Sequence, residues 1–319
     1  MDLSWFVFVG IYGGVVTLVV WPRYWTGRRF LLRWHIGEPD DAQIATAVRY
    51  LRRRRLPVVP LLLLTGAVLA ALGFAPSGGS PQDGLAFLAA LLVALLLAEL
   101  LPAIRPVPDA RPSRPPLVPS YAVRLYATLL AVTVAAALAG LAAQPAADRT
   151  LDSLPPNRAG PDGSGIVLAD SYRTELANPT GWLIIVTATL AALVVLAVVR
   201  IAHSWRADPD ERLDLVLRVR TARVGVGLGI AVTAALGTAA VDRLGRLANF
   251  VDGNPIDGGA ITGTFPVAGP DFPAVAAPPA WLQPWPDLHP PLGLALLIAG
   301  ILGWAWVANP PRRLPAPAA

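Results

Sequence analysis

The chain has no cysteine among its 319 residues, and all 26 of its basic residues are arginine. Without cysteine it can form no disulfide framework, no thiolate metal site and no cysteine nucleophile. Without lysine it cannot form a lysine Schiff base. The exclusive use of arginine is most simply explained by a GC-rich coding sequence, so we give it no functional weight.

Charge is scarce as well. Charged residues make up 15% of the chain, against about 25% in an ordinary soluble domain. Hydrophobic residues make up 55%, and the mean hydropathy is +0.54. A water-soluble protein of this length could not easily bury so much apolar surface. The composition therefore indicates an integral membrane protein.

Motifs for chemistry are also missing. The three histidines, His35, His203 and His289, show no metal-ligand spacing such as H-E-x-x-H. The run DGSG at 162–165 lacks the leading glycine of serine-hydrolase patterns, and no P-loop is present. We therefore expect no catalytic, cofactor-binding or metal-binding residues, no cofactor and no enzymatic activity.

Long apolar runs are what the chain has instead. A transmembrane helix needs about 20 apolar residues to cross the hydrocarbon core. The sequence predicts an all-α membrane protein of seven transmembrane helices, at 3–21, 57–75, 84–104, 121–143, 181–202, 222–241 and 291–308.

Arginine distribution orients these spans. With the N-terminus outside and the C-terminus inside, the inner segments 22–56, 105–124, 200–223 and 309–319 carry 9, 4, 6 and 2 arginines, which leaves five for the outer segments. This satisfies the positive-inside rule. We therefore read the net charge of +5 as topology and contact with anionic lipid, with no nucleic-acid partner.

Two outer segments, 144–180 and 242–290, are rich in Pro, Gly and Asp and are predicted to be irregular extracytoplasmic loops. They divide the chain into spans one to four (1–143), the first loop, spans five and six (181–241), the second loop, and span seven with its inner tail (291–319).

Two inner segments share a helix-start pattern. Glu38-Pro39-Asp40-Asp41 and Asp208-Pro209-Asp210-Glu211 each place a proline between acids, which is typical of a capped helix N-terminus. We expect helices to open at Pro39 and Pro209. The first, at 39–56, should be amphipathic and lie at the inner surface. The apolar side chains expected to face the membrane are Ile44, Val48 and Leu51. The side chains expected to contact lipid headgroups are Arg52, Arg53, Arg54 and Arg55.

The shared pattern also suggests an internal repeat. Spans one and five both lead inward to an acid-Pro-Asp-acid run and return through the next span, so spans 1–4 and 5–7 could be parallel copies of one unit. The alternative is that two helices have the same common start pattern by chance.

Small residues recur every four positions in the sixth predicted span, at Gly225, Gly229, Thr233 and Gly237. Such a stripe lets another helix approach closely. Packing within the chain is one reading, and homodimerisation through this face is the other.

One acid lies well inside a predicted span. Glu99 sits in the inward third of the third span, where a carboxylate is costly and indicates function or a partner. It could be a proton or cation site. It could instead form a structural ion pair with Arg124 at the start of the next span, or with Arg105 if Pro102 bends the helix.

The YLRRRR block before a span, together with the Arg-, Ala- and Pro-rich composition, resembles uncharacterised integral membrane proteins of high-GC actinobacteria. This resemblance implies a multi-pass protein of the bacterial plasma membrane and no particular activity.

Two functions follow. The first is a non-enzymatic membrane scaffold or accessory subunit, which would bind a membrane-protein partner or a second copy through its outer loops and inner helices. The second is a small transporter or channel that uses Glu99.

Overall fold

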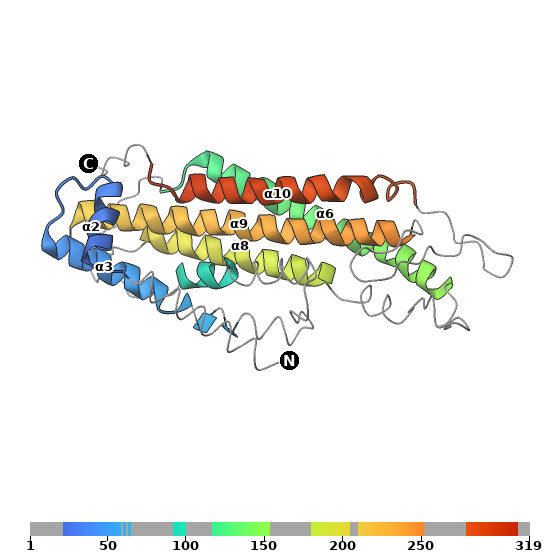
Figure 1. Ribbon diagram of the computed structural model, residues 1–319, viewed down its shortest axis with the longest axis horizontal. Helices are drawn as coiled ribbons and strands as arrows, with labels where there is room; N and C mark the ends of the chain where they lie inside the picture. The colour runs from blue at the N-terminus through green and yellow to red at the C-terminus, as the bar shows by residue number, and fades with distance from the viewer. Residues whose placement is uncertain are drawn as a thin grey trace, which may run out of the picture. The chain divides into compact units, whose positions relative to one another are not determined.

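The computed structural model describes residues 22–58, 60–61, 63–64, 92–99, 117–153, 180–204, 210–251 and 279–311. Within these ranges every regular element is a helix (Figure 1). The helices are α2 (Tyr24–Arg33), α3 (Asp41–Arg55), α6 (Ser120–Ser153), α8 (Thr180–Ser204), α9 (Glu211–Val251) and α10 (Trp285–Ala308).

Four helices, α6, α8, α9 and α10, are long and apolar enough to cross a membrane. They contain the spans predicted at 121–143, 181–202, 222–241 and 291–308. The predicted spans at 3–21, 57–75 and 84–104 lie wholly or largely outside the described residues. The prediction of an all-helical multi-pass membrane protein is confirmed at this level, and the count of seven stays a prediction.

Both predicted outer loops begin as helix. α6 continues to Ser153 and α9 to Val251, so 144–153 and 242–251 are helical, and α10 begins at Trp285 inside the second predicted loop. The reason is apolar periodicity that the Pro- and Gly-rich composition obscures. Buried side chains from the end of α6 pack against buried side chains from the end of α9, namely Ala143, Ala147 and Leu151 with Leu244, Leu247 and Phe250.

The inner segment before the sixth predicted span is not a separate helix. α9 runs without interruption from Glu211 to Val251. Neither glycine nor proline occurs between Glu211 and Arg223 to end the helix, and three of its arginines have partners within the protein, as described below. The helix therefore continues from the charged segment into the apolar one.

Both acid-Pro-Asp-acid runs do open helices, but two residues later than predicted. Asp40 is the N-cap of α3, where its side chain accepts from the Gln43 backbone N–H at 2.7 Å. Asp210 accepts from the backbone N–H groups of Arg212 and Leu213 at 2.9 and 3.3 Å. An aspartate side chain is short enough to reach these backbone donors, which favours Asp40 over Glu38 as the cap of α3. Pro39 therefore precedes the cap, and Pro209 lies outside the described residues.

The chain forms two compact units, the first made of Met1–Thr128, Thr189–Ala235 and Ala299–Ala319, the second of Leu129–Ala188 and Leu236–Ile298. In the first unit α2 and α3, drawn in blue in Figure 1, pack on each other and on the first turns of α9. An added Cβ on Gly27 of α2 would lie 2.6 Å from Val48 Cγ2, so glycine permits this close approach.

The apolar face of α3 points into this core. Ile44 and Val48, predicted to face the membrane, pack with Leu31 of α2 and Leu213 of α9, and Leu51 is also buried. The prediction was wrong because it treated α3 as an isolated helix. A neighbour from more than 160 residues away in the sequence covers the face instead of lipid.

In the second unit α9 contacts α6 and α10. Arg243 donates to the Gln144 side chain at 2.8 Å, and Thr238 donates to the Gly293 carbonyl at 3.1 Å. Over its most apolar stretch α9 is 89% buried, against 28% for each of the other three long helices. α9 is thus the helix that the others cover.

Candidate functional site

The start of α9 runs parallel to α3 and in register with it. Gln43 Nε2 donates to Asp210 Oδ2 at 2.5 Å, Tyr50 Oη to the Leu217 carbonyl at 3.3 Å, and Arg54 Nη2 to Thr221 Oγ1 at 2.7 Å. The two members of each pair are 167 residues apart. A constant separation means that both helices advance in the same direction over three turns.

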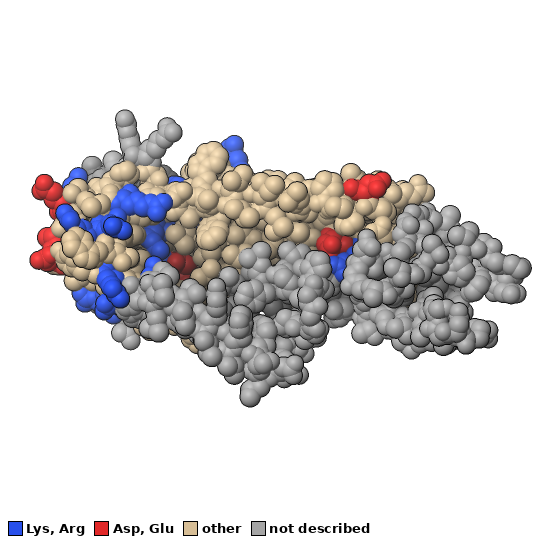
Figure 2. Space-filling view, in the orientation of Figure 1, with Lys and Arg blue, Asp and Glu red and all other residues tan. Residues whose placement is uncertain are grey.

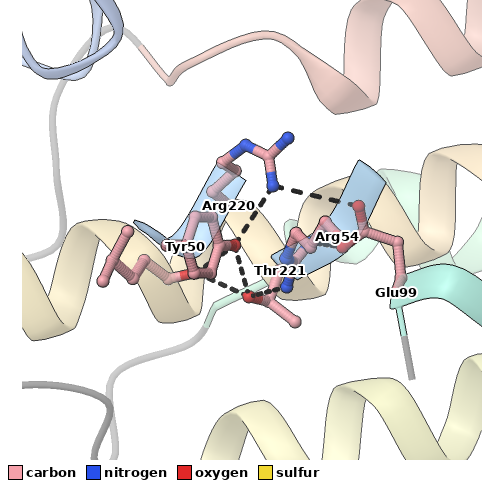
Figure 3. A network of polar contacts seen from close by, with 6 residues as sticks. Tyr50, Arg54, Glu99, Arg220 and Thr221 are labelled. Carbon is pink, nitrogen blue, oxygen red and sulfur yellow. Dashed lines mark hydrogen bonds and ion pairs between the residues drawn. The ribbon is translucent and has the colours of Figure 1, made fainter. Parts of the chain in front are cut away.

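Glu99 lies at the end of this pairing (Figure 3). Its Oε2 contacts Arg54 Nη1, and its Oε1 is 3.9 Å from Arg220 Nη1. The side chains of Glu99, Arg54 and Arg220 are 9, 6 and 18% exposed. A buried carboxylate is therefore compensated by two guanidinium groups, one from α3 and one from α9.

Tyr50 organises the two arginines. Its hydroxyl accepts from Arg220 Nη1 at 3.1 Å and is 2.9 Å from Thr221 Oγ1. Its ring lies 4.3 Å from the Arg54 guanidinium carbon and 5.3 Å from that of Arg220, which is cation–π geometry. We call Tyr50, Arg54, Glu99, Arg220 and Thr221 the Glu99 cluster.

Burial changes the pKa values of Arg54 and Tyr50 in the cluster. Burial lowers the pKa of Arg54 to about 9, with Tyr50 raising it and Arg220 lowering it further, so the guanidinium stays protonated near neutral pH. Burial raises the pKa of the Tyr50 phenol, but Arg54, Arg220 and the hydrogen bond with Thr221 outweigh this and leave it below its ordinary value.

Of the two partners predicted for Glu99, Arg124 is not among those found. Arg124 is an exposed residue of α6, and the ion pairs described for Glu99 go to Arg54 and Arg220; Arg105 lies outside the described residues. The prediction considered only Arg124 on the next span and Arg105 at the end of the span that carries Glu99. The partners come from two helices whose proximity to Glu99 is a matter of tertiary packing.

The four arginines predicted to contact lipid headgroups have different surroundings. Arg53 is exposed and Arg55 half-buried, while Arg52 Nε donates to the Pro22 carbonyl at 3.1 Å. Arg54 is buried in the Glu99 cluster, so its assignment to lipid was wrong. Consecutive helical residues point about 100° apart, and four in a row cannot share one face.

Two further arginines of α9 donate hydrogen bonds to backbone carbonyls at the ends of other helices. Arg218 donates to the Ala202 and His203 carbonyls of α8 at 2.6 and 2.8 Å. Arg223 donates to the Asn309 carbonyl, just beyond α10, at 3.1 Å. Terminal carbonyls have no partner within their own helix, and a cation is favourable there. Arginines that the sequence reading used only to assign topology thus also connect helices.

The small-residue stripe of α9 is covered by helices of the same chain. An added Cβ on Gly225 would lie 2.7 Å from Val198 Cγ1 of α8. An added Cβ on Gly229 would lie 2.5 Å from Val195 Cγ2 of the same helix. Thr233 is fully buried, and an added Cβ on Gly237 would lie 2.7 Å from Thr133 Oγ1 of α6. The stripe therefore serves packing within the chain, and these residues are not available to a second copy.

The histidines contact backbone carbonyls. His203 and His289 each place Nδ1 within 3.1 Å of the carbonyl four residues earlier, and His35 Nε2 is 2.8 Å from the Pro311 carbonyl. Among the described residues no group of three or more His, Asp or Glu could hold a metal ion.

Comparisons with protein-family models, with curated proteins and with solved structures find no match to this chain. Its function is therefore argued from its own geometry.

Proposed function

We propose that this protein is a non-enzymatic scaffold or accessory subunit of a bacterial plasma-membrane complex. Its four long apolar helices would hold it in the bilayer, with the N-terminus outside and the C-terminus inside. A membrane-protein partner or a second copy would bind through the outer segments and the inner helices α2 and α3.

The observation that carries this proposal is the pairing of Glu99. A proton or cation site needs a carboxylate that can release or accept its charge partner. Here the carboxylate contacts Arg54, with Arg220 at 3.9 Å, and Arg54 is itself bonded to Thr221 of α9. This arrangement favours a structural role, in which Glu99 joins its own helix to α3 and α9.

The inner helices have the firm attachment that a scaffold requires. Besides the contacts of α3 with α9, Arg33 Nη2 of α2 donates to Asn309 Oδ1 at 2.5 Å. His35, beyond the end of α2, reaches the Pro311 carbonyl. The α2–α3 pair is thus bonded to the beginning of α9 and to the segment after α10, and would present a defined surface to a partner.

The parallel register of α3 and α9 also supports the internal repeat. Both helices begin at an aspartate cap within the same four-residue pattern, and their polar contacts keep one constant separation. We propose that they are equivalent elements of two copies packed side by side.

Co-purification tests the scaffold function. Extracted from native membranes in a mild detergent, the full chain should migrate with a stoichiometric partner or as a defined homo-oligomer. The same complex should form with Glu99→Gln as long as the variant stays folded. A monomer that, in proteoliposomes, carries a cation or proton flux lost in Glu99→Gln would replace the scaffold with the transporter.

A further inference from the structure

Helix α2 exposes a face that its own packing does not explain. Gly27, Leu31 and Trp34, just after the helix, are buried on one side. At about 100° per residue, Trp25 and Leu32 lie within about 20° of each other on the roughly opposite side. Trp25 is 65% and Leu32 43% exposed. Two large apolar side chains thus stand out from a helix that is already packed on its other side.

Arginines border this apolar pair on both sides. Arg28 and Arg29, both exposed, lie about 50° to either side of Trp25 and Leu32 on the helical projection. Figure 2 shows basic side chains gathered over α2 and α3. Asp41 of α3 contacts α2 by accepting from Tyr24 Oη at 2.8 Å. Tyr24 projects about 100° away from Trp25 on the helical projection, and its ring packs edge-on against the Trp25 ring with the centroids 5.9 Å apart.

We propose that this face of α2, made of Trp25, Arg28, Arg29 and Leu32, docks on the anionic headgroup surface of the protein's own bilayer. The apolar pair enters the boundary between headgroups and acyl chains, where a tryptophan ring is favourable. The two arginines extend their side chains to lipid phosphates on either side.

The bilayer is the occupant that the composition favours. A protein interface would not require cations on both sides of the apolar pair, whereas an anionic lipid surface attracts both. The helix also begins two residues after the Pro22 carbonyl that Arg52 holds, and the first predicted span ends at position 21. The assignment adds α2 to the arginines of α3 predicted to contact lipid, of which Arg54 is buried in the protein.

The absence of cysteine allows a direct test. Leu32→Cys carries a polarity-sensitive fluorophore in the full-length protein, reconstituted in nanodiscs of zwitterionic or of mixed zwitterionic and anionic lipid. The matched control is Ala45→Cys, an exposed position of α3. In anionic nanodiscs the probe at position 32 should emit at shorter wavelength and lose intensity with brominated lipid, and the probe at position 45 should not. Arg28→Gln with Arg29→Gln should remove the dependence on anionic lipid.

The inference rests on the membrane location proposed above, and different experimental outcomes would contradict the membrane location and the docking face. A chain that does not incorporate into nanodiscs contradicts both. A chain that incorporates while position 32 stays as water-exposed as position 45 in both lipids overturns the docking face alone. So does a blue shift at position 32 in detergent that grows with protein concentration, which would assign the face to a second copy.

Discussion

Glu99 shows how a single buried charge is accommodated by residues far from it in the sequence. Its carboxylate contacts Arg54 and lies near Arg220, and each guanidinium is held in turn by Tyr50 or Thr221. Removing one member of such a pair leaves the other charge buried and uncompensated, which is more costly than removing both.

Replacing Glu99 with Gln should therefore lower the free energy of unfolding by about 3 kcal/mol. Denaturant or thermal unfolding in detergent measures this. The double variant Glu99→Gln with Arg54→Gln should lose less than the sum of the two single variants, because the two residues are coupled.

Arg124→Gln is the matched control, since the sequence alone favours Arg124 as the partner. As an exposed substitution it should change stability by no more than about 0.5 kcal/mol. If Arg124, and not Arg54, shows coupling to Glu99 in the double-variant cycle, then the ion pair is assigned to the wrong arginine.

At the scale of the helix, the aspartate caps decide where α3 and α9 begin. Asp210 accepts two backbone N–H bonds of α9 and a bond from Gln43 of α3, so the same carboxylate starts one helix and joins it to another. Burial raises its pKa, but the bonds from Gln43, Leu213 and Arg212 outweigh this, and its pKa lies below the ordinary 3.8.

Asp210→Ala should lose about 1 kcal/mol of stability, the usual value of an N-cap. Because the folded pKa is depressed, the extra stability from the ionised form is fully present above pH 3.8 and is lost as pH falls through the folded pKa. Thermal unfolding should thus show the gap between wild type and Asp210→Asn narrowing at low pH. A gap that is constant with pH would mean that ionisation of Asp210 contributes nothing.

Glycines in α9 set how closely α8 and α6 approach it. Gly229→Ala should destabilise the protein by about 1–3 kcal/mol, because its Cβ would lie 2.5 Å from Val195 Cγ2 and 3.2 Å from Tyr126 Cε2. Gly140→Ala of α6, with no such atom within 4 Å, should be neutral or gain up to about 1 kcal/mol in helix propensity. Unfolding in detergent compares them. Unchanged stability of Gly229→Ala together with a changed oligomeric state would assign the stripe to an interface between copies.

At the scale of the molecule, the predicted orientation in the membrane rests on arginines that also have structural partners. Arg54, Arg218 and Arg223 are buried, so the count of positive charge on the predicted inner side includes residues that lie within the protein. The positive-inside rule concerns where arginine charge is retained while the chain inserts into the membrane, and not the contacts that each arginine makes after folding.

Cysteine labelling in intact cells tests the orientation. A membrane-impermeant maleimide should react with Ser164→Cys in the first outer segment and should not react with Asp41→Cys, an exposed residue at the start of α3, until the membrane is opened. Labelling of Asp41→Cys in sealed cells would show that the predicted orientation is wrong. The natural chain, which lacks cysteine, is the unlabelled control.

The sequence by itself determined those features that depend on residues near one another in the chain. Apolar runs of sufficient length became the four long helices, because lipid requires each helix to satisfy its own backbone. Aspartate after proline opened α3 and α9, because a cap acts over two or three residues. These forces are local, and their signals are readable in order along the chain.

Only the tertiary structure decided which residues those helices bring together. The apolar face of α3 could meet lipid or protein equally well by pattern, and packing against α2 and α9 chose protein. Glu99 required a cation, but several arginines were available, and the parallel register of α3 with α9 selected Arg54 and Arg220. Burial and ion pairing depend on neighbours that are distant in the sequence. The sequence of a helix can therefore indicate that a side chain requires a partner, but it does not identify that partner.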